Sequence, residues 1–147
     1  MEFPTTGTRF VSRHEVTDGR VRAFGEASGD HNPLHFDDDY AERTRFQGRI
    51  AHGMLTASFV SAAIADAFGS DSQVVIYVDQ RLRFMRPVRL GDVITVVLEV
   101  LEANSERHQL RLATSCSNQA DKVVMDGEAT IMLEAIPVVP AELKKAA

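Results

Sequence analysis

Residues 29–35, with the sequence Gly-Asp-His-Asn-Pro-Leu-His, are the densest run of polar side chains in the chain. This run places the carboxylate of Asp30 five residues before the imidazole of His35. A carboxylate and a histidine held together can orient a water molecule, accept one of its protons and return a proton elsewhere. Histidine suits this task near neutral pH because its unperturbed pKa is about 6.5. Pro33 lacks an amide donor and keeps Asn32 out of the helical region, so a rigid turn would fix both side chains.

Two other interpretations of this run stay open on spacing alone. An aspartate-capped turn with two solvated histidines would look the same in the sequence. Asp30, His31 and His35 also have the chemistry of metal ligands. We do not expect a metal, because Pro33 interrupts the His-x3-His spacing and no further histidine and cysteine cluster accompanies it.

The run His52-Gly53-Met54 stands where a long helix is predicted to begin. The first amides of a helix have no intrahelical partner and carry positive potential. A glycine at that edge lets a substrate approach the backbone closely. The amide of Gly53 is therefore a candidate donor to an oxygen that becomes negative in a transition state. The alternative is that Gly53 only opens the helix.

The elements that must position these groups begin with a helix over 53–68, which is closed by Gly69. Apolar and small residues surround this helix almost completely, which predicts that it is buried and lies close to a sheet. Upstream, the pattern predicts a strand over 9–16, a helix over 18–28 capped by Thr17, and a short helical turn over 37–44.

After Gly69 the pattern changes to strands. We expect strands at 73–85, 93–102, 107–117 and 122–135, with a bulge at Gly127. Their short connections predict that successive strands are antiparallel neighbours. One slim apolar helix packed on a curved antiparallel sheet makes an α+β domain. The tail, residues 136–147, is expected to be extended or frayed.

Composition narrows the classes of function. The chain has 147 residues, 44% of them hydrophobic and 25% charged, which is typical of one soluble globular domain spanning 1–147. A net charge of −5 argues against nucleic-acid or anionic-membrane partners. The single cysteine, Cys116, excludes an internal disulfide framework. No apolar run is long enough for a membrane span, and the first residues lack a signal-peptide pattern. We therefore expect a cytoplasmic protein.

Several motifs along the chain resemble those of the MaoC-like, (R)-specific enoyl-CoA hydratase family. The first part of the match comprises Ser28-Gly29-Asp30, Asn32-Pro33-Leu34-His35, Phe46, Ile50, His52-Gly53-Met54-Leu55 and Ser61. The likeness continues through Ile76-Tyr77, Leu82-Arg83-Phe84, Arg86-Pro87-Val88, Leu90-Gly91-Asp92 and Asp126-Gly127-Glu128-Ala129. Nearly the whole chain is covered.

The resemblance implies a hotdog fold, in which a curved antiparallel sheet wraps a long central helix, and a homodimer. It implies that Asp30 and His35 hold the water that adds to C3 of a trans-2-enoyl thioester, while a proton goes to C2. Asn32 would support this polar network, and the Gly53 amide would donate to the thioester carbonyl. Ser61 would lie further into the pocket. The acyl-CoA substrate needs no metal or redox cofactor for this reaction.

Other residues are candidates for contacts with the rest of the substrate. Arg81 and Arg83 share one strand face, close to Arg86 and Arg89, and would contact coenzyme A phosphates or an acidic carrier protein. A solvated strand face is the simpler explanation of these arginines. An acyl chain lying along the helix would contact Val60 and Ile64, which are also ordinary core residues.

Three functions remain. The first is hydration of enoyl-CoA, and the second is the reverse dehydration of a 3-hydroxyacyl thioester on a carrier protein in fatty-acid synthesis. The catalytic residues are the same for both. The third is a hotdog protein that binds acyl thioesters without converting them. Asp30, Asn32, His35 and Gly53 are all present, which argues against the third.

Overall fold

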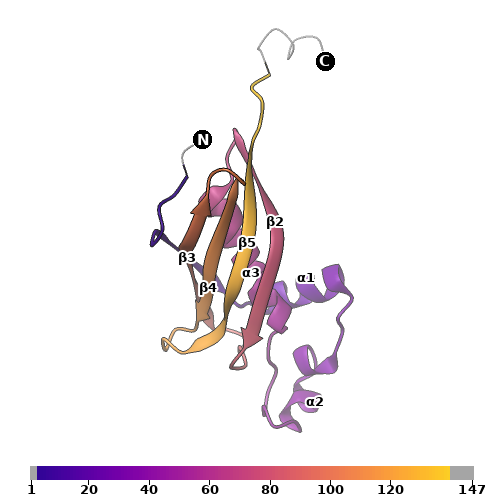
Figure 1. Cartoon of the computed structure of the whole chain (residues 1–147). Coiled ribbons are helices and arrows are strands. Elements are labelled where there is room, and N and C mark those ends of the chain that lie inside the picture. Colours follow the sequence, from indigo (N-terminus) through magenta and orange to yellow (C-terminus); the bar gives the residue numbers. More distant parts are fainter. Residues whose placement is uncertain (1–2, 140–147) are drawn as a thin grey trace.

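The computed structural model describes residues 3–139, and they form one sheet packed against one long helix (Figure 1). The elements, in chain order, are β1 (Arg9–Glu15), α1 (Asp18–Ser28), η1 (Pro33–His35), α2 (Asp38–Glu42), α3 (Gly53–Phe68), β2 (Gln73–Phe84), β3 (Val93–Asn104), β4 (Gln109–Ser117) and β5 (Val123–Ala135). The α+β prediction is confirmed, and every predicted helix and strand is present within a few residues. The single turn of 3-10 helix, η1, was not predicted.

The sheet is antiparallel throughout, in the order β1-β3-β4-β5-β2. The prediction that successive strands are neighbours holds for β3, β4 and β5 but is wrong for β2, which pairs with β5 at the far edge. The connection between β2 and β3, residues 85–92, is not a tight turn. It instead hydrogen-bonds to the segment that leads into α3. There the Ala51 amide donates to the Val88 carbonyl at 2.8 Å, and Ile50 forms a bridge with Arg89.

The expected bulge at Gly127 is also wrong. Gly127 pairs regularly with Leu82 on one side and with Thr114 on the other. A glycine is needed there for another reason, because a Cβ would collide with the backbone carbonyl of Arg81. The register instead shifts on β2 between Tyr77 and Asp79 and on β3 between Val100 and Glu102. A third shift lies between Met125 and Val123 of β5, opposite Cys116 and Ser117 of β4.

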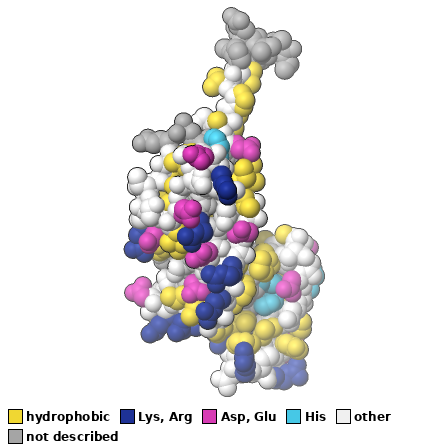
Figure 2. Space-filling model, viewed as in Figure 1, with side chains coloured by type: hydrophobic (Ala, Val, Ile, Leu, Met, Phe, Trp, Pro, Cys, Tyr) yellow, Lys and Arg dark blue, Asp and Glu magenta, His cyan; other side chains and the backbone are white. Residues whose placement is uncertain are grey.

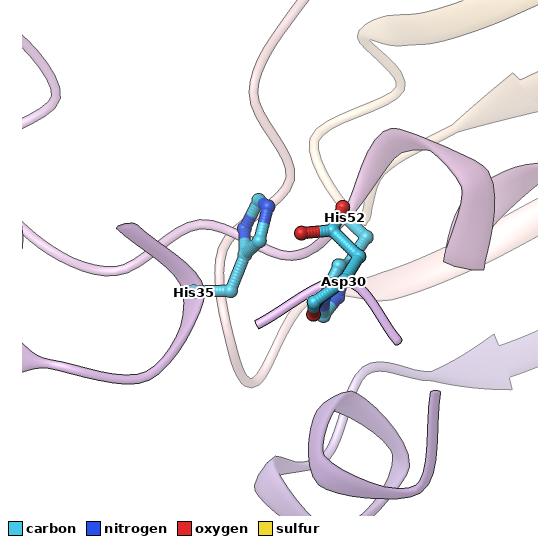
Figure 3. Close-up of side chains that lie close together, drawn as sticks. All are labelled: Asp30, His35 and His52. Carbon is cyan, nitrogen blue, oxygen red and sulfur yellow. The ribbon is translucent and has the colours of Figure 1, made fainter. Parts of the chain in front are cut away.

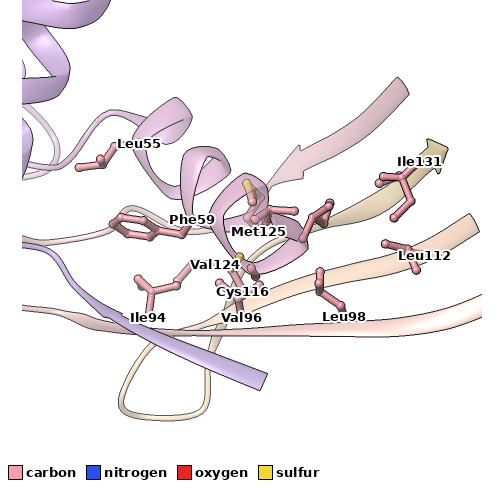
Figure 4. Packing of buried hydrophobic residues seen from close by; sticks show 14 of the residues in the cluster. Leu55, Phe59, Ile94, Val96, Leu98, Leu112, Cys116, Val124, Met125 and Ile131 are labelled. Carbon is pink, nitrogen blue, oxygen red and sulfur yellow. The ribbon is translucent and has the colours of Figure 1, made fainter. Parts of the chain in front are cut away.

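The hydrophobic core lies between one face of α3 and the concave face of the sheet (Figure 4). Burial alternates along β3 and β4, as expected when one face of a strand meets the core. The helix contributes Leu55, Phe59, Val60, Ala63, Ile64 and Phe68. These apolar contacts hold the start of α3 in a fixed place at one end of the sheet.

The other face of α3 is exposed in this chain, which corrects the expectation of burial on nearly all sides. Its exposed residues are Gly53, Met54, Ser58, Ser61, Ala62, Ala65 and Asp66. The sheet covers only one side of the helix, so the small and apolar residues of the opposite side remain uncovered.

Of the predicted tail, residues 136–139 carry no helix or strand, and the rest lies outside the described residues. Between residues 3 and 139, no helix is long and apolar enough to cross a membrane.

Candidate active site

Three side chains from two separate segments meet near the start of α3 (Figure 3). Asp30 and His35 come from the segment after α1, and His52 immediately precedes α3. One carboxylate oxygen of Asp30 and one ring nitrogen of each histidine lie within 4.8 Å of one another. The structure thus brings together the predicted pair, Asp30 and His35, and adds His52, to which the sequence analysis gave no role.

Local hydrogen bonds shape the loop that carries Asp30 and His35. Gly29 ends α1 in the left-handed region, at a φ of 77°, which turns the chain toward Asp30. The carboxylate of Asp30 accepts a hydrogen bond from the Asn32 amide at 3.1 Å. The Asn32 side chain in turn accepts from the Leu34 amide at 3.1 Å and so caps η1, the turn that contains His35. Asn32 therefore positions His35 through the backbone, and its predicted part in a water network stays a prediction.

His35 is oriented with one ring nitrogen available. Its Nδ1 lies 2.8 Å from the carbonyl oxygen of Ile50, and because a carbonyl only accepts, Nδ1 carries the proton. Nε2 is then the unprotonated nitrogen of the neutral ring. Burial lowers the pKa of His35 from its ordinary value of 6.5, and nearby His52 lowers it further, while the Ile50 bond and Asp30 oppose the change. A neutral ring with a bare Nε2 can accept a proton near pH 7.

His52 is the more deeply buried of the two histidines, with 2% of its surface exposed against 8% for His35. Its ring lies against the His35 ring, with centroids 3.9 Å apart, and its Nε2 is 3.0 Å from the Asp30 carbonyl. Within residues 3–139, neither His52 Nδ1 nor the Thr56 hydroxyl has a hydrogen-bond partner, although both are buried. The site therefore contains two buried polar atoms that make no hydrogen bond within the described residues.

A cavity of about 490 Å³ opens beside these side chains. Its polar lining includes Asp30, His35, His52 and Thr56, and its apolar lining includes Phe46, Met54, Phe84, Met85, Val88 and Met125. Figure 2 shows histidine side chains at the surface in the lower part of the molecule, bordered by hydrophobic ones. An apolar cavity with a few convergent polar groups is typical of a small-molecule site.

Gly53 lines this cavity at the start of α3, and no side chain among the described residues caps the helix. A Cβ at Gly53 would lie only 2.8 Å from the ring of Phe84. The Phe84 ring is therefore the group of this chain that packs closely on Gly53. The donor role of the Gly53 amide toward a substrate stays a prediction.

The other predicted contacts do not line the cavity within the described residues. Val60 and Ile64 are buried in the core, and Ser61 is on the exposed face of α3. Arg81 and Arg83 are exposed on β2, and two other arginines, Arg45 and Arg86, line the cavity instead. Arg86 belongs to the arginine run seen in the sequence, but no motif pointed to Arg45.

Asp30, His35 and His52 are also the residues that could together hold a metal ion, whereas His31 does not belong to this cluster. Each histidine already uses one ring nitrogen on a backbone carbonyl. The remaining arrangement is a carboxylate beside a neutral imidazole that can accept a proton. Together with free amides at a helix start, this can activate water and stabilise a developing negative oxygen.

Comparisons with known proteins agree with this geometry. A family described as the MaoC like domain matches residues 2–121. The chain is 41% identical over 125 residues to 3-hydroxybutyryl-CoA dehydratase of Methylorubrum extorquens, covering 85% of this chain and 78% of that protein. It is 40% identical over 120 residues to the (R)-specific enoyl-CoA hydratase of Rhodospirillum rubrum, covering 82% and 81%.

Among solved structures, the unliganded R-hydratase PhaJ1 of Pseudomonas aeruginosa superposes with a TM-score of 0.81 at 40% identity. The match covers 93% of this chain and 89% of that one. The predicted hotdog architecture is thereby confirmed. Sequence match, relatives and fold agree, and the chain belongs to the MaoC-like family of hydratases and dehydratases.

Proposed function

We propose that this protein is an (R)-specific enoyl-CoA hydratase, which adds water to trans-2-enoyl-CoA and gives (R)-3-hydroxyacyl-CoA reversibly. The observation that carries the proposal is the His35 ring, with Nδ1 bound to the Ile50 carbonyl and Nε2 bare, close to the Asp30 carboxylate at the wall of an apolar cavity. The relatives named for hydration and dehydration of CoA thioesters support it.

The reaction begins with a water molecule held between Asp30 and His35. His35 Nε2 accepts one proton as the water oxygen forms a bond to C3 of the enoyl thioester. The electron pair of the C2–C3 double bond moves toward the thioester carbonyl, whose oxygen becomes negative. The Asp30–His35 pair then returns one proton to C2, so the net change is the addition of H and OH.

The Gly53 amide is the donor to the thioester oxygen in this proposal. It belongs to the first turn of α3, where amides have no intrahelical acceptor and the helix dipole favours negative charge. The ring of Phe84, which packs on Gly53, would form one wall of the thioester position. No metal or redox cofactor takes part.

The deciding experiment follows loss of the conjugated enoyl thioester by absorbance, across a series of chain lengths, on both CoA and carrier-protein forms. Faster turnover of the CoA form supports the proposal, and faster turnover of the carrier-protein form selects the dehydratase of fatty-acid synthesis instead. Chiral chromatography of the hydrated product should give the (R) isomer. Binding without turnover on either form would identify a non-catalytic acyl-thioester protein.

We further propose a homodimer in the cytoplasm. The edge strand β2 exposes Val74, Ile76 and Val78, and Met54 on the uncovered face of α3 is 57% exposed. An unpaired apolar strand edge and an apolar helix face are surfaces that a second copy would cover. Light scattering should give twice the chain mass, and Ile76→Lys should shift the protein toward monomer. A wild-type protein of single-chain mass would contradict this assembly.

A further inference from the structure

We propose that His52 is a positioning residue for the Asp30–His35 pair: it holds the Asp30 backbone through its Nε2 and supports the ring of His35 from one side. The inference rests on the proposed function, because it concerns the reaction assigned to that pair. His52 is not part of the acid–base step itself.

The first observation is the hydrogen bond from His52 Nε2 to the Asp30 carbonyl, at 3.0 Å. Asp30 is an exposed residue on the loop between α1 and η1, and between residues 3 and 139 its side chain bonds only to the Asn32 amide, two residues ahead. The His52 bond is therefore the described side-chain contact that ties the Asp30 backbone to a distant part of the chain. A displacement of about 1 Å in a catalytic group costs on the order of 10² in rate, so such an anchor matters.

The second observation is that His52 is itself immobilised. Its ring is 2% exposed and is surrounded by the rings of Phe24, Phe36 and His35, at centroid distances of 4.8, 5.4 and 3.9 Å. The adjacent Ala51 amide is fixed to the Val88 carbonyl. Because the His52 ring is held by packing on several sides, its hydrogen bond fixes the Asp30 loop relative to the core.

The third observation is the pattern of protons on the two rings. His35 uses Nδ1 and His52 uses Nε2, each on a backbone carbonyl that can only accept. His52 Nδ1 has no partner within the described residues, so Nε2 makes the one hydrogen bond of this ring there. His52 therefore acts on the site through the Asp30 carbonyl and through its contact with the His35 ring, whose centroid lies 3.9 Å away.

The test compares His52→Gln, His52→Asn and His52→Leu. The glutamine amide nitrogen reaches the position of Nε2 and can donate to the Asp30 carbonyl. The asparagine amide is too short for this, and leucine has no donor. Because the anchor acts on geometry, we expect His52→Leu and His52→Asn to lower kcat by about 10² with little change in KM. His52→Gln should recover at least tenfold of this loss.

A matched control is His14→Leu. His14 also packs on an aromatic ring, with its centroid 4.7 Å from that of Phe59, but it does not line the cavity. This variant should lower the melting temperature without changing kcat. If the three His52 variants lose kcat only in proportion to their loss of melting temperature, with no advantage for glutamine, the positioning role is refuted.

A readout that needs no turnover separates this inference from the proposed function. Long-range ¹H–¹⁵N correlation spectra of the wild-type protein distinguish the two neutral tautomers of each histidine. We expect the Nδ1–H form for His35 and the Nε2–H form for His52. An Nδ1–H form of His52 would overturn the inference even in an active enzyme. The expected tautomers in a protein that turns over no thioester would refute the proposed function instead.

Discussion

The two ends of α3 are attached to the molecule in different ways. At its start, His35 and His52 direct ring nitrogens at the backbone carbonyls of Ile50 and Asp30. At its end, Phe68 packs edge-on against Phe10, with ring centroids 4.9 Å apart, as part of the apolar core. Directional bonds fix geometry, whereas apolar burial supplies most of the stability. Catalysis and stability should therefore respond to substitutions at opposite ends of one helix.

The largest effect on rate is expected beside the start of the helix. Asp30→Asn and His35→Ala should each lower kcat by about 10²–10⁴, the range for loss of general acid–base catalysis. Because the two groups act on one water, the double variant should be little worse than either single one. Asp30 is exposed, so the melting temperature of Asp30→Asn should stay close to wild type. A single variant that keeps wild-type kcat would remove that residue from the pair.

The converse variant is at the other end. Phe68→Ala should cost about 3–5 kcal/mol of unfolding free energy, because it removes a buried ring and leaves a cavity. Its kcat, corrected for the folded fraction, should equal that of wild type. Urea denaturation and steady-state kinetics on the same preparation measure both quantities. Loss of kcat in the folded fraction would mean that the two ends are coupled after all.

Gly53, which contacts Phe84, is a position where both rate and stability could change. A Cβ there would lie 2.8 Å from the Phe84 ring, and because Phe84 is 56% exposed, its ring can move aside at small cost. Gly53→Val should therefore lower kcat/KM by about 10², comparable to losing one oxyanion donor, with little loss of stability.

Adding Phe84→Leu to Gly53→Val separates two explanations of that loss. If the added side chain blocks the thioester, the second substitution leaves kcat/KM low. Recovery of kcat/KM to the level of Phe84→Leu alone would mean that Gly53 serves only to accommodate Phe84.

A smaller effect is expected from pH. Burial lowers the pKa of His35 below 6.5, so its ring remains a base somewhat below that pH, and the acid limb of kcat/KM should fall below pH 6.5. Because the pKa of His35 is lower in the folded chain, the unfolded chain binds this proton more readily. The free energy of unfolding is therefore unaffected by His35 above pH 6.5 and decreases as the pH falls below it.

Rate profiles and thermal melts of wild type and His35→Gln measure both effects. Below pH 6.5 the melting temperature of His35→Gln should fall less steeply than that of wild type. Some decrease should remain, because burial also lowers the pKa of His14. An acid limb above pH 6.5 would contradict a buried, neutral His35.

The smallest expected effect is that of chelation, which should leave kcat unchanged. Asp30, His35 and His52 lie close enough to bind an ion, but the proposed acid–base addition of water needs none. Activity is measured after exhaustive dialysis against a chelator. A loss that added zinc restores would reassign the three side chains as ligands.

Helices and strands were predictable because their signals are local. The run from Gly53 to Phe68 has helical composition and ends at a glycine, and the strands are marked by β-branched residues between turns. Asp30 and His35 were predictable because they flank one proline turn. Pairing of β2 with β5 depends on contacts far apart in the sequence, and no turn signal encodes it.

The role of His52 escaped sequence reasoning for the same physical reason. Its partner, the Asp30 carbonyl, is a backbone atom 22 residues away and leaves no side-chain signature. Arg45 and Arg86 reach the cavity from two loops that meet only in the folded chain. Residues placed by tertiary contact, rather than by a local motif, are those that the sequence alone did not reveal.

The position of β2 has a consequence for biosynthesis. Its neighbour is β5, the last strand of the part of the chain that the structure describes, and the pairing joins Gln73 to Ala135 and Phe84 to Met125. At about 5–20 residues per second, β2 leaves the ribosome several seconds before its partner exists. During that interval the nascent chain carries an unpaired strand containing Val74, Ile76 and Val78, three of its exposed apolar residues. Newly made chains are thus exposed to self-association until β5 is synthesised and the sheet closes.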